Sequence, residues 1–87
     1  MGEESALRRA LEDLWKARTR IAYGRFNAAR EAARAAKEFR IDTPDPDGTF
    51  TLHRARQAEN AALDEYRRVL TIFSDLVAYG KIPDEEA

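Results

Sequence analysis

The chain of 87 residues contains no cysteine and a single histidine. The absence of cysteine excludes a disulfide framework, a thiolate nucleophile and a zinc site with sulfur ligands. The histidine, His53, lacks the Lys-Gly pair that usually follows the reactive histidine of phosphotransfer domains. Glu-x-x-His pairs, nucleophile elbows and phosphate-binding loops are also missing from the sequence. We therefore expect a protein that is not an enzyme and that holds no metal or cofactor.

Long apolar runs are missing as well. No stretch approaches the roughly 20 apolar residues that a membrane-spanning helix needs. The first residues, MGEESALRR, are charged and contain no apolar segment of the kind found in secretion signals. We expect a soluble cytoplasmic protein that does not associate with a membrane.

Proline is scarce, and its three residues lie at positions 44, 46 and 83, close to two of the four glycines. The residues between these breaks are mostly Ala, Leu, Arg and Glu, which favour helix. Thr49 or Thr51 is expected to cap the second helix, and Gly80 to end it. The sequence predicts one all-α domain over 1–87, with a helix at about 4–40, a Pro/Asp/Gly turn at 41–49, a helix at about 50–79 and a short tail at 80–87.

Apolar residues in both helical segments recur at alternating spacings of four and three, with a few charged residues in the same positions. This spacing is that of a coiled-coil seam, and it predicts two antiparallel helices packed at a shallow angle. The fold class is therefore a coiled-coil-like helical hairpin. In the first segment the seam runs through Leu7, Leu11, Leu14, Arg18, Ile21, Arg25, Ala28, Ala32, Ala35 and Phe39. In the second it runs through Leu52, Arg56, Glu59, Leu63, Tyr66, Leu70, Phe73 and Val77.

The end of the hairpin away from the turn carries more apolar surface than two helices can bury. The second segment reads VLTIFSDLVAY there, whereas both segments are rich in alanine near the turn. A helix that is apolar nearly all round is usually buried all round. We therefore predict that two chains pair into a homodimeric four-helix bundle. The predicted oligomer interface consists of Leu14, Trp15, Val69, Ile72, Phe73, Leu76 and Tyr79.

Charged residues interrupt the predicted seam at Arg18, Arg25, Arg56 and Glu59. On one interpretation the arginine stems cover apolar surface while their charged ends reach water. On the other, this seam polar cluster fixes the register and the number of partners at some cost in stability. In that case Glu59 of one chain meets Arg18 or Arg25 of another.

The turn contains the stretch DTPDPDGTF, which matches part of a calcium-loop pattern. With Gly48 at the sixth position, Asp45 and Asp47 take the third and fifth positions. However, the first and twelfth positions fall on Thr43 and Arg54, and the twelfth should supply a bidentate glutamate. The two prolines also favour extended backbone rather than a loop curled around an ion. We interpret the stretch as a stiff turn without a metal, in which Gly48 supplies a positive φ.

Charge is distributed unevenly along the chain, although the net charge is only −1. The first helix has an outer face of basic residues with one aromatic. This candidate anion-binding surface consists of Lys16, Tyr23, Arg30, Arg34 and Lys37. Basic residues next to an aromatic can bind a nucleic acid through phosphate contacts and stacking. The slightly negative total charge argues against that partner, because nucleic-acid-binding domains are usually markedly basic. A solvated helix face explains the same pattern.

Together these patterns predict a small, non-enzymatic helical module for oligomerisation or protein interaction. Its expected partner is a second copy of itself, an unidentified protein, or both. The alternative is binding of a nucleic acid or another polyanion through the basic outer face of the first helix.

Overall fold

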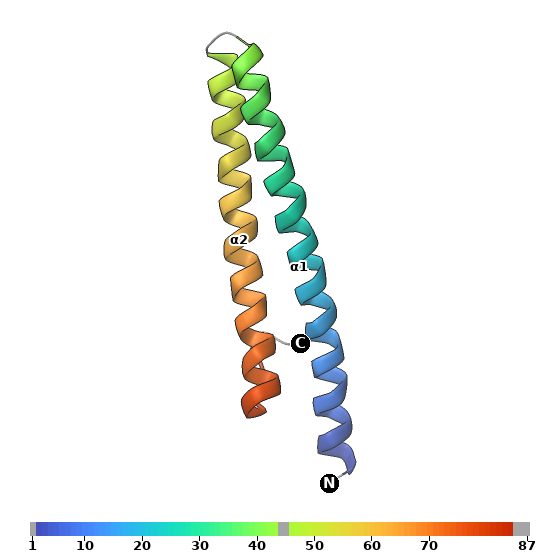
Figure 1. Ribbon diagram of the computed structural model, residues 1–87. Helices are drawn as coiled ribbons and strands as arrows, with labels where there is room; N and C mark the ends of the chain where they lie inside the picture. The colour runs from blue at the N-terminus through green and yellow to red at the C-terminus, as the bar shows by residue number, and fades with distance from the viewer. Residues whose placement is uncertain (1, 44–45, 85–87) are drawn as a thin grey trace.

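The computed structural model consists of two helices packed against each other as an antiparallel hairpin (Figure 1). It describes residues 2–43 and 46–84, apart from the side chain of Glu4. Helix α1 spans Gly2–Asp42 and helix α2 spans Asp47–Tyr79. The predicted all-α hairpin is therefore confirmed. No helix in the described part of the chain is long and apolar enough to cross a membrane.

The turn between the helices is shorter than the predicted 41–49. Helix α2 begins after Pro46, whose backbone is already helical with φ −90° and ψ −7°. The amide of Phe50 donates to the Pro46 carbonyl at 2.9 Å, which closes the first helical turn. Proline is well tolerated at a helix start, and Asp47 in the first turn complements the positive end of the helix dipole. Thr49 and Thr51 thus lie inside the helix, and the prediction that one of them caps it is wrong.

Gly48 is needed for a different reason from the predicted one. Gly80 is the only described residue with a positive φ, so Gly48 does not supply a left-handed turn position. Instead it is buried in the first turn of α2, directly against the end of α1. A Cβ atom added at Gly48 would lie 2.9 Å from the Thr43 carbonyl oxygen and 3.0 Å from the Arg40 Cα atom. The absence of a side chain is what allows the two helices to approach this closely.

The core is a narrow stripe between the helices, and its register on α1 differs from the predicted seam. It includes Trp15 and Ala22 where the seam placed Leu14 and Ile21. On α1 the indole of Trp15 faces α2 at the open end, whereas alanines face α2 nearer the turn. These small side chains let the two helices lie close together. An eleven-residue step from Ala22 to Ala33 follows the natural period of a straight helix rather than a heptad. The buried apolar residues are Leu11, Trp15, Ala22, Ala33, Ala36, Leu52, Val69 and Leu76.

The register difference leaves several predicted seam residues at the surface. Ile21 is 54% exposed and Phe39 is 45% exposed, although both belong to the predicted α1 seam. On α2 the stripe passes through Val69 and Leu76, so that Leu70 and Val77 lie at its edge and are exposed. A contact stripe therefore runs along both helices, as predicted. Its residues differ from the predicted ones by about one position along much of its length.

The far end of α2 is closed by a glycine and by an arginine from the other helix. Gly80 is left-handed with φ 68°, and its amide donates to the Leu76 carbonyl at 2.9 Å. The guanidinium of Arg8 on α1 donates to the carbonyls of Leu76 at 3.4 Å and Val77 at 3.0 Å. A cation at a helix C-terminus satisfies carbonyls that have no helical partner and complements the dipole. Arg8 therefore ties the start of α1 to the end of α2.

The molecule is a thin rod rather than a globule. Its principal extents are 64 × 20 × 17 Å, and its radius of gyration is 18.2 Å. A compact domain of this length would have a radius of gyration of about 12 Å. Each helix can therefore bury only the one side that faces its neighbour.

The role of Gly48 predicts opposite effects for two glycine-to-alanine substitutions. Gly48→Ala should lower the free energy of unfolding by about 1–3 kcal/mol, because the methyl group overlaps backbone atoms. Gly24→Ala is the matched control, since a Cβ there meets nothing within 4 Å. It should raise stability by up to about 1 kcal/mol through helix propensity. Urea unfolding followed by circular dichroism measures both, and equal shifts would contradict the close-approach role of Gly48.

Candidate functional site

A groove in the middle of the rod combines apolar walls with clustered charge. Its volume is about 290 Å³, and both helices contribute to it. We call it the basic groove. It is lined by Trp15, Arg18, Ile21, Ala22 and Arg25 from α1 and by Glu65, Arg68 and Val69 from α2.

The charges of the basic groove are partly paired with one another. Arg68 donates to both carboxylate oxygens of Glu65, at 2.7 and 3.0 Å. The hydrogen bond from Arg68, with help from the positive charges of Arg68 and Arg25, holds the pKa of Glu65 below its ordinary value, although partial desolvation opposes this. The Arg18 guanidinium lies 4.6 Å from the centre of the Trp15 ring, as in a cation–π contact. The residues that line the groove carry three positive charges and one negative charge.

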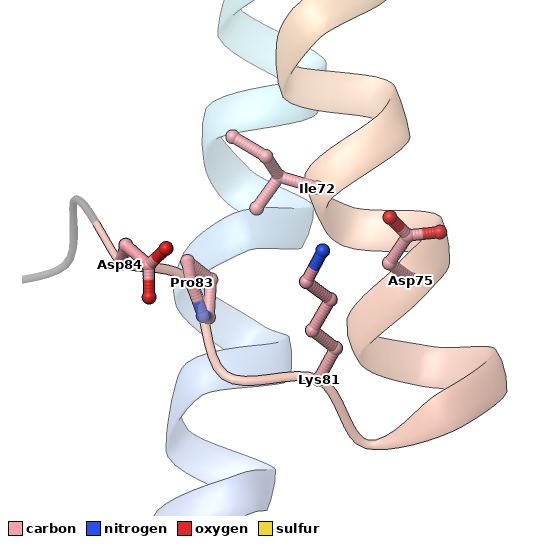
Figure 2. A pocket seen from close by; sticks show the side chains of 5 residues that line it. All are labelled: Ile72, Asp75, Lys81, Pro83 and Asp84. Atoms are coloured by element: carbon pink, nitrogen blue, oxygen red, sulfur yellow. The ribbon is translucent and has the colours of Figure 1, made fainter.

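A second pocket lies where the chain leaves α2. Its volume is about 220 Å³, and we call it the acidic pocket. Figure 2 shows Ile72 and Asp75 on α2, with Lys81 extending back toward them from the segment that carries Pro83. Asp84 completes the lining. Asp75 and Asp84 make no ion pair with any other described residue. The residues that line the pocket carry two negative charges and one positive charge, of Lys81.

The basic groove and the acidic pocket lie on the same side of the hairpin. Glu65 and Arg68 line the first, while Ile72 and Asp75 line the second, each seven residues further on. Residues seven apart lie on the same side of a helix, two turns from each other. We call this side the docking face. It also carries apolar residues at the same spacing: Leu7, Leu14 and Ile21 on α1, and Ile72 and Tyr79 on α2.

The opposite side of the hairpin holds an aromatic cluster that the sequence analysis did not identify. The ring of Tyr66 lies 5.3 Å from Tyr23 and 6.3 Å from Phe26, centre to centre. Arg30 covers the Phe26 ring at 5.4 Å. The cluster is thus packed within the chain, across the two helices. Recognising it requires the pairing of α1 with α2, because its members are 43 or 40 residues apart in sequence.

Three of the seven residues predicted for the oligomer interface are not available to a second chain. Trp15, Val69 and Leu76 are 1%, 3% and 0% exposed and form the core of the hairpin itself. Two helices are enough to cover them because α1 and α2 approach closely. Leu14, Ile72 and Phe73 are half-buried against this core, and Tyr79 is 81% exposed. The accessible part of the predicted interface is therefore its rim.

The seam polar cluster is divided by the observed register. Arg18 and Glu59 are half-buried at the edge of the helix contact. Arg25 and Arg56 are exposed, because the contact stripe passes beside their positions rather than through them. Arg18 and Arg25 meet in the basic groove, whereas Arg56 lies near the turn, beside Arg40 and His53. The structure thus does not bring the four residues together.

The residues predicted to bind anions on α1 do lie on exposed surface. Lys16, Tyr23, Arg30, Arg34 and Lys37 are all exposed. Two of them have local partners: Arg34 pairs with Glu31 at 3.2 Å, and Arg30 donates to Asn27 at 2.8 Å. The Tyr23 ring faces Tyr66 of the aromatic cluster. The five residues are accessible, but part of their hydrogen-bonding capacity is used within α1.

The stretch that matched part of a calcium loop is only partly described. Asp45 lies outside the described residues, and Asp47 and Gly48 belong to the first turn of α2. Residues 2–43 and 46–84 contain no group of three His, Asp or Glu side chains placed to hold a metal ion. His53 is exposed on α2.

Comparison with known proteins adds no functional information. The sequence matches no protein-family model, and neither the curated proteins nor the solved structures contain a significant match. Any function must therefore be argued from the surface of this hairpin and not from its fold, since one fold can host many functions.

The pairing in the basic groove makes Glu65 sensitive to Arg68. Because the pKa of Glu65 is lowered in the folded chain, its pairing stabilises the fold at pH above its unfolded pKa, and this contribution disappears as pH falls through the lowered pKa. Arg68→Gln should move the pKa of Glu65 back toward its ordinary value. Arg67→Gln, at the adjacent exposed position, should leave it unchanged. Titration of the carboxyl carbons by NMR measures both, and an unmoved Glu65 in Arg68→Gln would contradict the assignment.

Proposed function

We propose that this protein is a non-enzymatic interaction module whose primary partner is a second copy of itself. In this proposal two hairpins stack on their docking faces to form a dimeric four-helix bundle. The observation that carries the proposal is the amount of surface that one hairpin leaves exposed.

The exposed area is large for a protein of this mass. The accessible surface is 6508 Å² for a chain of 9.9 kDa. A compact monomer of that mass would expose about 5,200 Å². The excess is roughly a quarter of the expected value, and it exceeds the roughly 800 Å² per partner that a standard protein interface buries. One further pair of helices would bring the exposed area close to that of a compact protein.

Apolar residues contribute to this excess on the docking face. Leu7 is 58% exposed, Ile21 is 54% exposed and Tyr79 is 81% exposed, and half-buried Leu14 and Ile72 lie between them. Full burial of a large apolar side chain contributes on the order of 1.5–3 kcal/mol. A hairpin with one contact stripe has little stability of its own, so this burial would couple folding to association.

The alternative function is binding of a polyanion through the basic face of α1. The exposure of all five residues on one side of the helix favours it. Electrophoretic mobility of a labelled single-stranded nucleic acid at low salt tests this alternative separately. Strong binding that weakens steeply with added salt would support it.

The self-association proposal predicts that Ile21→Lys dissociates the dimer. The lysine would replace an apolar contact of the interface by a charge whose desolvation is unfavourable, and it would lie beside Arg18 and Arg25 in the basic groove. Ile21 is suited to the test because it is exposed in the single hairpin, so its replacement does not disturb the core as a change at Leu76 would. The expected result by light scattering is a shift from dimer mass toward monomer mass at micromolar concentration.

Ile41→Lys is the matched control for this experiment. Ile41 is 77% exposed at the turn end of α1, away from the docking face, and the substitution is chemically identical. It should leave the mass unchanged, and a basic residue in the last helical turn is itself favourable. The proposal fails if both variants keep the same mass as the unmodified chain, or if the unmodified chain is already a monomer.

A further inference from the structure

We infer that the two copies dock antiparallel, so that the basic groove of each meets the acidic pocket of the other. This inference rests on the proposed self-association and specifies its face and register. It identifies the occupant of the basic groove as the Asp75 region of a second copy of this chain.

Charge complementarity within one face carries the inference. The basic groove holds Arg18, Arg25 and Arg68 against Glu65, and so has an excess of positive charge. The acidic pocket holds Asp75 and Asp84 against Lys81, and so has an excess of negative charge. The two are separated by seven residues along α2, which is about 10.5 Å. When a second copy of such a face is rotated by 180°, its negative position lies opposite the positive position of the first copy, and the reverse.

The required symmetry is a two-fold axis that lies between the hairpins and runs across their long axis. It stacks α1 on α1 of the second copy and α2 on α2, each pair antiparallel. Such an interface is isologous, so every contact occurs twice. If the axis passes midway between the basic groove and the acidic pocket, Arg68 of each copy lies opposite Asp75 of the other. Both positions are on α2, and Arg68 retains its hydrogen bonds to Glu65.

The same axis also matches the apolar residues of α1. The levels of the two helices are related by contacts such as the Tyr23–Tyr66 ring pair. On that scale the midpoint between Arg68 and Asp75 on α2 lies at the level of the midpoint between Leu14 and Ile21 on α1. The half-turn therefore places Leu14 of one copy opposite Ile21 of the other. The contact of Arg68 with Asp75 and the contact of Leu14 with Ile21 therefore occur in one register, in which the Arg18 residues of the two copies lie nearest the axis.

Other ways of pairing two copies lack this agreement. A parallel stack would place one basic groove against the other, and like charges facing each other are unfavourable. Stacking on the opposite side would bring together two aromatic clusters, each covered in part by Arg30. Those rings are already packed within their own chain. The docking face is therefore the side that fits a second copy.

Two charge-reversal variants, Asp75→Arg and Arg68→Asp, test the inference. In a homodimer of the first, the introduced arginine faces Arg68 of the other copy, and in a homodimer of the second, the introduced aspartate faces Asp75. For each variant alone, the dissociation constant of the homodimer should rise by a factor of roughly ten or more relative to the unmodified chain. An equimolar mixture should recover association, because its heterodimer includes a contact between the two introduced side chains, which are of opposite charge, and the native contact between Arg68 and Asp75. If association returns when the two variants are mixed, the cause must be a contact between chains. Partial loss of helicity in either variant alone cannot produce that result.

Asp13→Arg is the control, since Asp13 is exposed on the outer side of α1 and lines neither the basic groove nor the acidic pocket. It should neither weaken self-association nor pair selectively with Arg68→Asp. Sedimentation velocity of each variant and of each mixture gives the masses. If the unmodified chain dimerises but the variants dimerise equally well, the register is overturned while self-association stands. If the unmodified chain is a monomer, both proposals fail. Selective pairing of Asp75→Arg with Arg68→Asp supports the inference.

Discussion

The structure depends on a single contact stripe between two long helices. Every buried apolar residue in the described chain belongs to this stripe, and beyond it α1 and α2 are flanked by half-buried side chains, by the segment that carries Pro83 and by solvent. Where the stripe contains alanine and glycine the backbones approach closely, and where it contains Trp15 and Leu76 the core is thicker. The hairpin thus has a small-residue end with a thin core, beside which Phe39, Ile41 and Phe50 are exposed. Its other end buries a few large side chains and exposes many more.

This asymmetry explains why the two ends are suited to different roles. At the turn, contact between the backbones near Gly48 and Arg40 leaves no room for an additional group. At the open end, Arg8 closes the C-terminus of α2, while Leu7 and Tyr79 remain exposed beside it. A second pair of helices would complete the core there without altering the contacts near the turn. Assembly through the open half of the rod is therefore consistent with the internal packing.

The helices and their antiparallel order could be predicted from the sequence, because proline position and apolar spacing depend only on neighbouring residues. The register could not, because Leu14 and Trp15, or Ile21 and Ala22, fit the same pattern until the distance between the helices is known. The role of Gly48 was missed for a similar reason, since its requirement comes from Arg40 and Thr43 across the turn. The candidate site was identified only in part: the sequence singled out Arg18, Arg25 and the open end. The contribution of Glu65, Arg68, Asp75 and Asp84 depends on which residues share a face.

Sedimentation equilibrium of the unmodified chain at micromolar concentration shows whether two hairpins assemble into one bundle. We expect a helical species of twice the chain mass of 9.9 kDa, which dissociates on dilution with loss of helicity. A single species of 9.9 kDa that stays fully helical at every concentration would contradict this expectation. One contact stripe would then be sufficient to hold the hairpin, and the exposed apolar residues of the docking face would not be needed for folding.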